Sequence, residues 1–400
     1  MPKMTPAHSA KPIGSRQWLS WLLASVMGIG LAVGASGLVL YNDLANQVAS
    51  SVLSTSNLGS TEPDEVDPSE SFNDSFEGRS LNILLMGIDA RVGQDDSIIN
   101  PEDDDETMRS DTTLVMHIAA DRQSVTVVSI PRDMWIQLPE CVRSDGSISY
   151  SQWGQFNWAF SYGALTDDLA GGVACTEDTV EELTGISIDG FAVIDFSAFA
   201  SMVDALGGVE ICLEEELVDD HYLGMTFEEG CQVMDPITAT QYARVRHVGD
   251  GSDMGRIQRQ QGLLGAMVMQ AMNANMLTDM SKLYAFMTAT LRATTLSPSL
   301  GNIRTDMGLA NSLKNMDPAD FRFTTMPVVT ADFDANRLLP KEPANQELWD
   351  ALMADEPMPE GTVYMDLEGE YFTMLADGTA EPGGNPRTDD EIGSLNGGVY

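Results

Sequence analysis

The chain has 400 residues, in which 61 acidic side chains outnumber 21 basic ones and give a formal net charge of -40. Such a charge repels a polyanion except at a local pocket, which argues against general binding to nucleic acid. Arginine supplies 16 of the 21 basic residues. Its forked guanidinium binds phosphate oxygens in a bidentate geometry that lysine cannot match, so the skew favours phosphate recognition over general solubility.

Residues 18–41 form an uncharged, largely apolar run near the N-terminus. At about 1.5 Å per residue this run is long enough to cross a hydrocarbon core of about 30 Å, so we predict a single transmembrane anchor. Lys3, Lys11 and Arg16 precede it without an acid, whereas every carboxylate follows it. The positive-inside rule therefore leaves residues 1–17 in the cytoplasm and the rest outside the cell membrane. A cleaved signal peptide is the alternative, but the run is longer than a usual signal core.

Beyond the span, polar segments flank a region of regular apolar spacing. Residues 42–80 are rich in Ser, Asn, Asp and Glu and indicate a flexible acidic linker, and residues 356–400 indicate a disordered acidic and Gly-rich tail. Between them, residues 81–355 predict one α/β domain, a mixed sheet with helices on both faces. Asp235 is the expected N-cap of one helix, with Pro236 in its first turn. Strands are expected at 81–87, 112–118, 124–130, 191–195 and 209–213, and helices at 178–183, 197–206 and 235–243.

Four cysteines, Cys141, Cys175, Cys212 and Cys231, lie on the side that we expect to be external. Thiols tend to oxidise there, and the spacing shows no CxxC metal pattern, so two disulfides are expected. The sequence permits three pairings. We prefer Cys141 with Cys175 and Cys212 with Cys231 because each pair closes a local loop, and four small buried thiols are the alternative.

Strand ends carry the first candidate site residues. Asp89 and Arg91, in NILLMGIDAR, come just past the end of one predicted strand, and Arg109 and Asp111, in RSDTT, come just before the next. Ligand sites of α/β domains form at strand ends, so these side chains are candidates for a shared site. Taken alone, a strand-end Asp is more often a turn or cap residue than a metal ligand.

Four arginines fall within sixteen residues, Arg244 and Arg246 in YARVRH and Arg256 and Arg259 in DMGRIQRQQ. An isolated basic cluster in so acidic a chain indicates a pocket for phosphate or pyrophosphate, although such arginines are more often solvated or salt-bridged. Arg256 and Gln260 are four residues apart on one face of a predicted long helix. They lie near the positive end of its dipole, where anions bind.

In this order and spacing, the segments resemble the LytR-CpsA-Psr family of cell-envelope proteins. The resemblance covers about 81–330 and includes SIPRD around Arg132, FNWAFSYG around Asn157 and the stretch from Gly190 to Leu213. It implies an external α-β-α domain of the LCP type behind an N-terminal anchor. It also implies a phosphotransferase that takes a glycan from a polyprenyl-pyrophosphate carrier and attaches it to peptidoglycan through a phosphodiester bond. Transfer to a surface protein is an alternative that the sequence does not separate.

The resemblance further implies a role for each candidate. Asp89 and Asp111 would hold Mg²⁺, or Mn²⁺, against the pyrophosphate, and Arg91 and Arg109 would assist at the rim. Asp253 would orient an arginine or the acceptor hydroxyl rather than act as a base, because a carboxyl group among arginines has a lowered pKa. The side chains expected to grip the pyrophosphate oxygens are Arg132, Arg244, Arg246, Arg256 and Gln260.

Further alternatives concern two segments and the activity itself. The acidic insert 94–106 departs from the family pattern and is either a solvated loop or a site for additional cations. Residues 262–277, which are apolar and rich in methionine, either line a channel for a polyprenyl tail or form ordinary core. The rival to an enzyme is a non-catalytic envelope receptor for lipid-linked glycan. A receptor does not require Asp89 and Asp111, because carboxylates beside a phosphate pocket weaken anion binding unless a cation intervenes.

Overall fold

The computed structural model describes residues 51–58, 74–76, 78–89, 108–165, 168–219, 224–245, 253–273, 286, 290, 293–301 and 303–383. The predicted anchor at 18–41 and the acidic insert at 94–106 lie outside these residues. Within the described part of the chain, no helix combines the length and the apolar character needed to cross a membrane.

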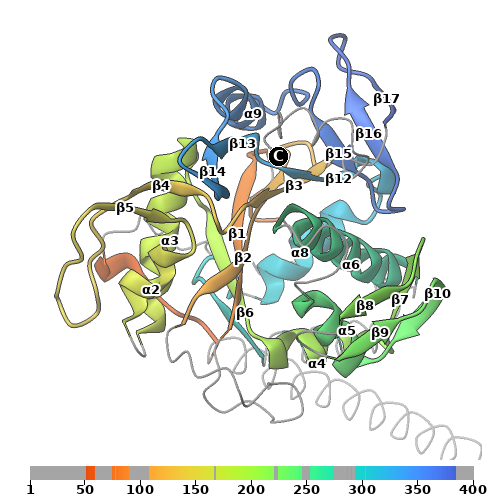
Figure 1. Cartoon of the computed structure of the whole chain (residues 1–400), viewed down its shortest axis with the longest axis horizontal. Helices are drawn as coiled ribbons and strands as arrows, with labels where there is room; N and C mark the ends of the chain where they lie inside the picture. The colour runs from red at the N-terminus through yellow and green to blue at the C-terminus, as the bar shows by residue number, and fades with distance from the viewer. Residues whose placement is uncertain are drawn as a thin grey trace, which may run out of the picture. The chain divides into compact units, whose positions relative to one another are not determined.

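The centre of the fold is a mixed sheet to which nine strands of the described residues belong (Figure 1). β1 (Leu81–Ile88) is parallel to β6 (Gly190–Ile194) and antiparallel to β2 (Ser110–Ile118). β3 (Val125–Ile130) is antiparallel to β2 and parallel to β12 (Phe321–Thr325). The remaining strands are β11 (Thr294–Leu296) beside β6, then β15 (Val363–Met365), β16 (Tyr371–Met374) and β17 (Ala380–Pro382) beyond β12.

Helices cover both faces of this sheet (Figure 1), which confirms the predicted mixed α/β fold. Side chains of β1 alternate between the two layers: Leu84 and Met86 join one core, and Leu81 and Ile83 join the other. β3 is buried at every position, as expected of a strand covered on both sides. The helices on the first face are α2 (Trp158–Ala164), α3 (Leu169–Thr184) and α9 (Ala344–Met353), and those on the second are α6 (Asp253–Asn273) and α8 (Ile303–Leu313).

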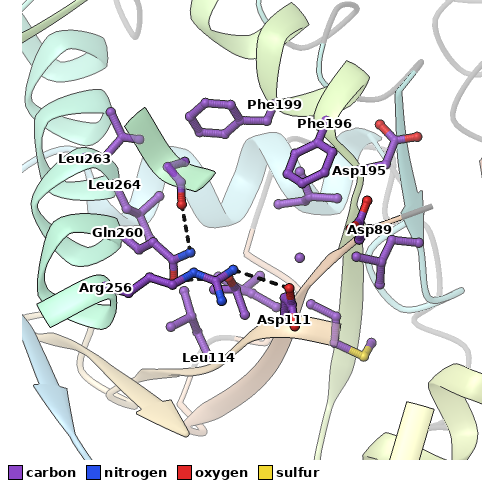
Figure 2. A pocket seen from close by; sticks show the side chains of 17 residues that line it. Asp89, Asp111, Leu114, Asp195, Phe196, Phe199, Arg256, Gln260, Leu263 and Leu264 are labelled. Carbon is purple, nitrogen blue, oxygen red and sulfur yellow. Dashed lines mark hydrogen bonds and ion pairs between the residues drawn. The ribbon is translucent and has the colours of Figure 1, made fainter. Parts of the chain in front are cut away.

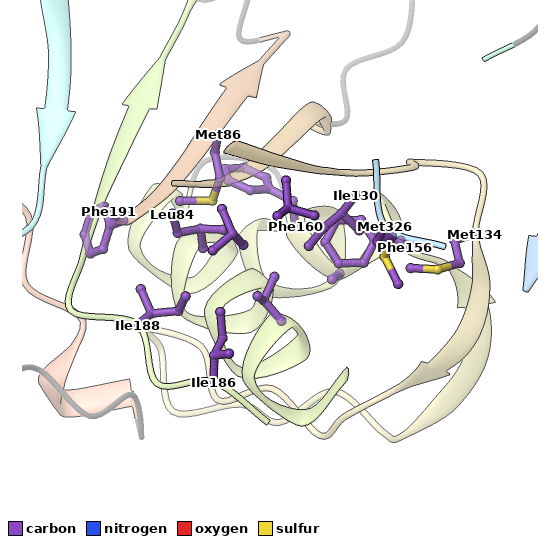
Figure 3. Close-up of a cluster of buried hydrophobic side chains, with 14 of the residues drawn as sticks. Leu84, Met86, Ile130, Met134, Phe156, Phe160, Ile186, Ile188, Phe191 and Met326 are labelled. Carbon is purple, nitrogen blue, oxygen red and sulfur yellow. The ribbon is translucent and has the colours of Figure 1, made fainter. Parts of the chain in front are cut away.

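The larger core lies between the sheet and helices α2 and α3 (Figure 3). Phe156 and Phe160 are fully buried there. The two helices approach closely because small residues line their contact: a Cβ added to Gly163 would lie 2.0 Å from the carbonyl oxygen of Gly171. The Cys141–Cys175 disulfide ties the segment after β4 (Trp135–Leu138) to α3.

A second apolar cluster lies beside α6 and is built by α4 (Phe196–Leu206), α5 (Pro236–Arg244) and the strand pair β7 (Val209–Leu213) and β10 (Gly230–Met234). α5 begins as predicted, because the Asp235 side chain accepts a hydrogen bond from the Thr238 backbone N–H at 2.8 Å and Pro236 occupies the first turn. The Cys212–Cys231 disulfide joins β7 to β10, so both predicted pairings are confirmed.

Two short hairpins lie side by side at the first face of the sheet. β4 pairs with β5 (Gln152–Gln155), and β13 (Val328–Ala331) pairs with β14 (Asp334–Pro340). A parallel bridge between Met134 and Leu338 connects the two hairpins. The remaining short elements are η1 (Ser56–Leu58), β8 (Leu217–Asp219), β9 (Met225–Phe227) and η2 (Pro318–Asp320).

The predicted elements are present with small shifts, except at one helix. The expected strands correspond to β1, β2, β3, β6 and β7, and the expected helices to α3, α4 and α5. α3 begins at Leu169 and not near residue 178. Asp168 caps it by accepting a hydrogen bond from the Gly171 backbone N–H at 2.9 Å. Its first half is made of small residues, which carry little of the apolar periodicity that marks a helix.

The predicted linker at 42–80 is wrong for the part that the structure describes. Val52 forms a parallel bridge with Leu296, and the Leu53 backbone N–H donates to the Leu296 carbonyl oxygen at 2.8 Å. Phe76 is 2% exposed and belongs to the core beneath α8. The segment is mostly polar and has few apolar residues. Its composition therefore gave no sign of the tertiary contacts that order it.

The prediction of a disordered tail from residue 356 is also wrong as far as Gly383. β15, β16 and β17 extend the main sheet, and Tyr364, Met365 and Met374 are buried. Strands this short give almost no periodic signal. They are stabilised by pairing, β15 with β12 and then β16 and β17 in succession, rather than by their own propensity.

The C-terminal strands should therefore contribute strongly to stability. A chain truncated after Asp355 loses the buried apolar side chains of Met358, Tyr364, Met365, Leu367 and Met374. Each large apolar side chain contributes about 1.5–3 kcal/mol when buried, so we expect a loss on the order of 10 kcal/mol. Urea unfolding measures the change, and a chain truncated after Gly383 is the matched control. Equal stability of the two truncated chains would contradict the expectation.

Asp178 in α3 should make stability depend on pH. Burial raises the pKa of its carboxyl to about 6, and Glu181 and Glu182 add repulsion. Because this folded-state pKa lies above the unfolded value, stability falls as the pH rises from about 4 to about 6. Asp178→Asn should stabilise the fold at pH 8 by roughly 1 kcal/mol after allowance for solvent screening, and the gain should vanish near pH 4. Thermal unfolding at both pH values measures the gain, and the same gain at both would exclude ionisation as its cause.

Candidate active site

A pocket of about 150 Å³ opens between the sheet and helices α4, α5 and α6 (Figure 2). Most of its wall is apolar, and the polar residues Asp89, Asp111, Asp195, Arg256 and Gln260 complete it. Strands β1, β2 and β6 supply one side, and α4 and α6 supply the aromatic and aliphatic side chains. The apolar residues are Leu85, Met86, Ile88, Leu114, Ile194, Phe196, Phe199, Ala243, Leu263 and Leu264.

The structure brings the predicted carboxylates Asp89 and Asp111 to one pocket. Asp89 follows the last residue of β1, and Asp111 is the second residue of β2. The two strands are antiparallel, so the end of one meets the start of the other, and the Asp89 backbone N–H donates to the Arg109 carbonyl oxygen at 3.2 Å. A register shift between Gly87 and Ile88 interrupts the ladder here, which aims side chains differently from a regular strand.

The Asp111 carboxylate lies between two of the predicted arginines. Its Oδ1 atom accepts a hydrogen bond from Arg132 Nη1 at 3.2 Å, and its Oδ2 atom is 3.5 Å from Arg256 Nη2. The exposed fractions of these side chains are 14% for Asp111, 20% for Arg132 and 8% for Arg256. Both guanidinium groups can donate to an anion at this end of the pocket, while Asp133 beside Arg132 and the pocket carboxylates Asp89 and Asp195 offset their charge.

Gln260 lies on the same face of α6 as Arg256, as predicted, and lines the pocket with it. Its amide connects two neighbouring elements: Thr112 Oγ1 donates to Gln260 Oε1 at 3.1 Å, and Gln260 Nε2 donates to the Ala243 carbonyl oxygen at 3.3 Å. These bonds hold α6 against β2 and against the end of α5. Gln260 therefore shapes the pocket wall in addition to facing its interior.

The arginine cluster divides between the two sides of α6. Arg244 is 6% exposed, and its guanidinium carbon lies 4.8 Å from the centroid of the Phe196 ring in the pocket wall. Arg259 turns the other way and donates through Nη2 to the Val245 carbonyl oxygen at 2.9 Å, away from the pocket. Arg91 and Arg246 lie outside the described residues, and so does the side chain of Asp253, although α6 begins at that position.

Several residues that sequence reasoning missed also build the site. Asp195 and the aromatic pair Phe196 and Phe199 line the pocket from the start of α4. Asp195 is the N-cap of that helix and accepts a hydrogen bond from the Ala198 backbone N–H at 2.7 Å. The signal was available, because an Asp between a predicted strand and a predicted helix marks a strand end as clearly as Asp89 does.

Gln261 holds α6 on the central sheet. It is 4% exposed, and its Nε2 atom donates to Ser129 Oγ at 2.8 Å and to the Thr324 carbonyl oxygen at 2.9 Å. These partners belong to β3 and β12 in the middle of the sheet. The four-residue spacing placed Gln260 on the face of Arg256. No sequence pattern showed that Gln261 points into the sheet, because that direction depends on how α6 lies on the sheet.

The apolar stretch 262–277 contributes both to the pocket and to the core in the part that the structure describes. Leu263 and Leu264 line the pocket, whereas Met267 packs in the second apolar cluster. The leucines at the start of the stretch thus face the pocket, and the methionine after them belongs to the core.

Asp89 and Asp111 fit a cation that is completed by substrate oxygens. Among the described residues, no three His, Cys, Asp or Glu side chains are grouped as a metal site. Mg²⁺ is commonly held by only one or two carboxylates together with substrate phosphates, and a pair of carboxylates on one pocket matches that requirement. Asp195 is a third carboxylate in the same wall, already engaged as a helix cap.

Comparisons with known proteins agree on one family. The LytR_cpsA_psr family model matches residues 47–354. Cell wall biosynthesis protein LcpA of Corynebacterium glutamicum is 28% identical over 75% of this chain and 64% of its own length, so the chain spans less than two thirds of that relative. Polyisoprenyl-teichoic acid--peptidoglycan teichoic acid transferase TagU of Oceanobacillus iheyensis is 24% identical over 66% of this chain and 72% of its own.

The fold itself is shared with a solved structure. Protein gbs0355 from Streptococcus agalactiae matches with a TM-score of 0.55 over 72% of this chain and 93% of that one. The two sequences are 18% identical, so the likeness concerns the fold alone.

Removal of the Gln261 contacts should loosen α6 and destabilise the protein. Gln261→Met keeps the size of the side chain but leaves Ser129 Oγ and the Thr324 carbonyl oxygen without this donor. A buried polar group that loses its partner costs about 1–3 kcal/mol, and we expect a loss of that size in urea unfolding. Gln270→Met, on the same helix, is the matched control. A loss no larger than in the control would show that Gln261 does not hold α6 on the sheet.

Proposed function

The chain belongs to the LytR-CpsA-Psr family, and from this premise we propose that it transfers a glycan from a polyprenyl-pyrophosphate carrier to peptidoglycan through a phosphodiester bond. The observation that carries the proposal is the pocket in Figure 2, whose apolar wall ends on two carboxylates and a buried arginine. A lipid pyrophosphate has the same division, an apolar tail joined to a highly charged group. The relatives named as transferases of polyisoprenyl-linked teichoic acid support this substrate class.

The lipid end of the donor fits the apolar part of the pocket. Phe196 and Phe199 of α4 face Leu263 and Leu264 of α6 across it (Figure 2). Contact between these side chains and an isoprenoid chain is favourable, because it removes apolar surface of both from water. The pocket wall thus selects a carrier with a hydrocarbon tail over a soluble nucleotide sugar.

The pyrophosphate belongs at the polar end. Arg256 stands in the first turn of α6, where the helix dipole and the guanidinium both attract an anion. Arg132 adds a second guanidinium on the other side of Asp111. Arg244 and Arg246 are proposed to add charge from the end of α5 and the segment after it, and Arg91 and Arg109 from the opposite rim.

Asp89 and Asp111 are the residues that would hold Mg²⁺ or Mn²⁺, which when bound neutralises charge on the pyrophosphate. The chain itself supplies positioning and charge stabilisation, which phosphoryl transfer mostly requires. The acceptor hydroxyl oxygen bonds to the phosphorus that carries the glycan, and the bond from that phosphorus to the bridging oxygen breaks. Polyprenyl phosphate leaves with the electron pair and takes up the hydroxyl proton. Asp253 would orient an arginine or the acceptor hydroxyl.

The location follows from the sequence. We infer that residues 18–41 anchor the chain in the cell membrane with the N-terminus in the cytoplasm and the catalytic domain outside. The two disulfides support an oxidising location for the domain. Such an arrangement brings the pocket to the compartment in which lipid-linked glycans and peptidoglycan meet.

Two other functions share parts of this site. A transferase whose acceptor is a surface protein would use the same donor pocket. A receptor that binds lipid-linked glycan without chemistry would use the arginines, but Asp89 would then serve no purpose beside an anion. The presence of that carboxylate favours the enzyme.

Asp89→Asn is the substitution that separates an enzyme from a receptor. It keeps the shape and removes one negative charge, so a metal-dependent transferase should lose activity by roughly 10²-fold or more, together with its response to added Mg²⁺. A receptor should bind the lipid pyrophosphate more tightly, by up to about 1 kcal/mol, since a repulsive charge is gone. Asp111→Asn also leaves Arg132 and Arg256 without their shared partner, so Asp89→Asn is the cleaner test.

Transfer of a labelled glycan from a polyprenyl-pyrophosphate donor to peptidoglycan is measured for the full-length chain with and without chelator, and donor binding is measured in parallel. Asp121→Asn, at an exposed turn, is the control. Transfer that persists unchanged in chelator would remove the metal from the mechanism. Tighter donor binding by the Asp89 variant, with no transfer by the wild type in any metal, would contradict the transferase and support the receptor.

A further inference from the structure

The hairpin formed by β4 and β5 carries an alternation of aromatic and amide side chains on one face. Trp135 pairs with Gln155, and Gln137 pairs with Trp153, so these four side chains share a face of the two strands. The opposite face holds Ile136 and Leu138, which are buried. Trp153 is 59% exposed, and Gln137 is exposed beside it. The first face is therefore directed to solvent.

The aromatic side chains on this surface gather with others from the neighbouring hairpin. Phe333, in the turn between β13 and β14, is 63% exposed and meets Trp135 edge to face, with ring centroids 6.1 Å apart. Tyr150, just before β5, is 84% exposed. In the described residues, all exposed aromatic side chains belong to these two hairpins. We call the set of Trp135, Gln137, Trp153, Gln155 and Phe333 the aromatic face.

The Trp135 ring of the aromatic face packs against a second tryptophan. Trp158 of α2 meets Trp135 edge to face at 5.9 Å. It reaches this place because position 154 is a glycine: a Cβ there would lie 2.6 Å from Trp158 Cε3. A surface that exposes large aromatic groups in a fixed arrangement commonly marks a binding site.

A chain of polar contacts joins the aromatic face to the pyrophosphate end of the pocket. Gln155 Nε2 donates to Asp133 Oδ1 at 2.6 Å, and Asp133 Oδ2 is 3.6 Å from Arg132 Nε. Arg132 Nη1 in turn donates to Asp111. Arg132 lines a small cavity with Asp111 and Arg256, but it does not line the apolar pocket. The aromatic face therefore begins on the side of Asp111 that is turned away from that pocket.

We propose that the aromatic face binds the glycan strand of the acceptor, an inference that rests on the proposed function. A pyranose ring presents C–H groups on its faces and hydroxyl or acetamido groups around its rim. Trp135, Trp153 and Phe333 offer flat apolar surfaces for the former. Gln137 and Gln155 carry amides for the latter, and the Nε2 atom of each also donates within the protein, to Ser151 Oγ and to Asp133 Oδ1. The members of the face are all uncharged, in a chain with a net charge of -40, which suits contact with sugar rings better than binding of a cation.

The geometry of phosphoryl transfer indicates that the aromatic face binds the acceptor and not the glycan of the donor. The attacking and leaving oxygens lie roughly in line across the phosphorus. The leaving polyprenyl phosphate is directed into the apolar pocket, so the attacking hydroxyl enters from the opposite side, where Arg132 and then the aromatic face lie. A strand seated on the face extends from this entry point.

The test uses the full-length chain with Trp153→Ala, Phe333→Ala and the double variant. Both side chains are exposed, so the fold is retained. The acceptor probe is a soluble strand of alternating N-acetylglucosamine and N-acetylmuramic acid freed of stem peptides. An aromatic contact is worth about a 2- to 12-fold change, so each single variant should raise the acceptor KM by roughly that factor and leave the donor KM unchanged. Trp153→Phe, which keeps a ring, should recover most of the loss.

Val233→Ala, at an exposed apolar side chain of β10, is the matched control and should leave both KM values unchanged. A wild-type acceptor KM in the double variant would overturn the inference while the proposed function stands, and a raised donor KM would assign the face to the donor glycan instead. If the wild type transfers nothing, calorimetric binding of the strand without donor decides: binding that is lost in the double variant supports the face, and no binding by the wild type overturns it.

Discussion

The contact of Asp111 with Arg132 and Arg256 determines how the site is assembled. Asp111 lies in β2, Arg132 in the segment after β3, and Arg256 in the first turn of α6, so one carboxylate joins three parts of the chain through 3.2 Å and 3.5 Å contacts. Two guanidinium groups with a carboxylate between them stay close to each other without the full repulsion of like charges. A guanidinium has several N–H donors, so an anion can be bound beside Asp111. The start of α6, and with it the pocket wall, is placed by this arrangement.

Asp111 also marks the boundary between surfaces of opposite chemistry. On one side lie the aromatic and aliphatic side chains of α4 and α6, such as Phe199 and Leu263. On the other side, the Arg132 and Asp133 contacts lead to the exposed Trp153 on the β4–β5 hairpin. The proposed reaction needs one surface for a donor with a lipid tail and another for a polar acceptor, and the two must meet at one phosphorus atom. The sheet supplies this because several strands end at the same place.

Much of the sheet was predictable because its central strands are continuous apolar runs. β1 and β3 are buried on both sides, and such runs are visible without knowledge of their partners. The start of α3 was missed because Gly171 and Gly172 suit close packing on α2 and not an apolar stripe. The C-terminal strands were missed because they are only three or four residues long. They form only when β15 pairs with β12 and β16 pairs with β15. In both cases the information lies in long-range contacts.

The sequence by itself indicated the family and the candidate carboxylates and arginines, and it favoured one of three disulfide pairings, because these depend on residue type and on local order along the chain. Only the tertiary structure decided which side chains meet. Arg256 faces the pocket and Arg259 faces away from it, and Gln261 binds the sheet whereas Gln260 lines the pocket. Neighbouring positions on a helix point in directions about 100° apart, so the rotation of α6 on the sheet selects among chemically identical residues.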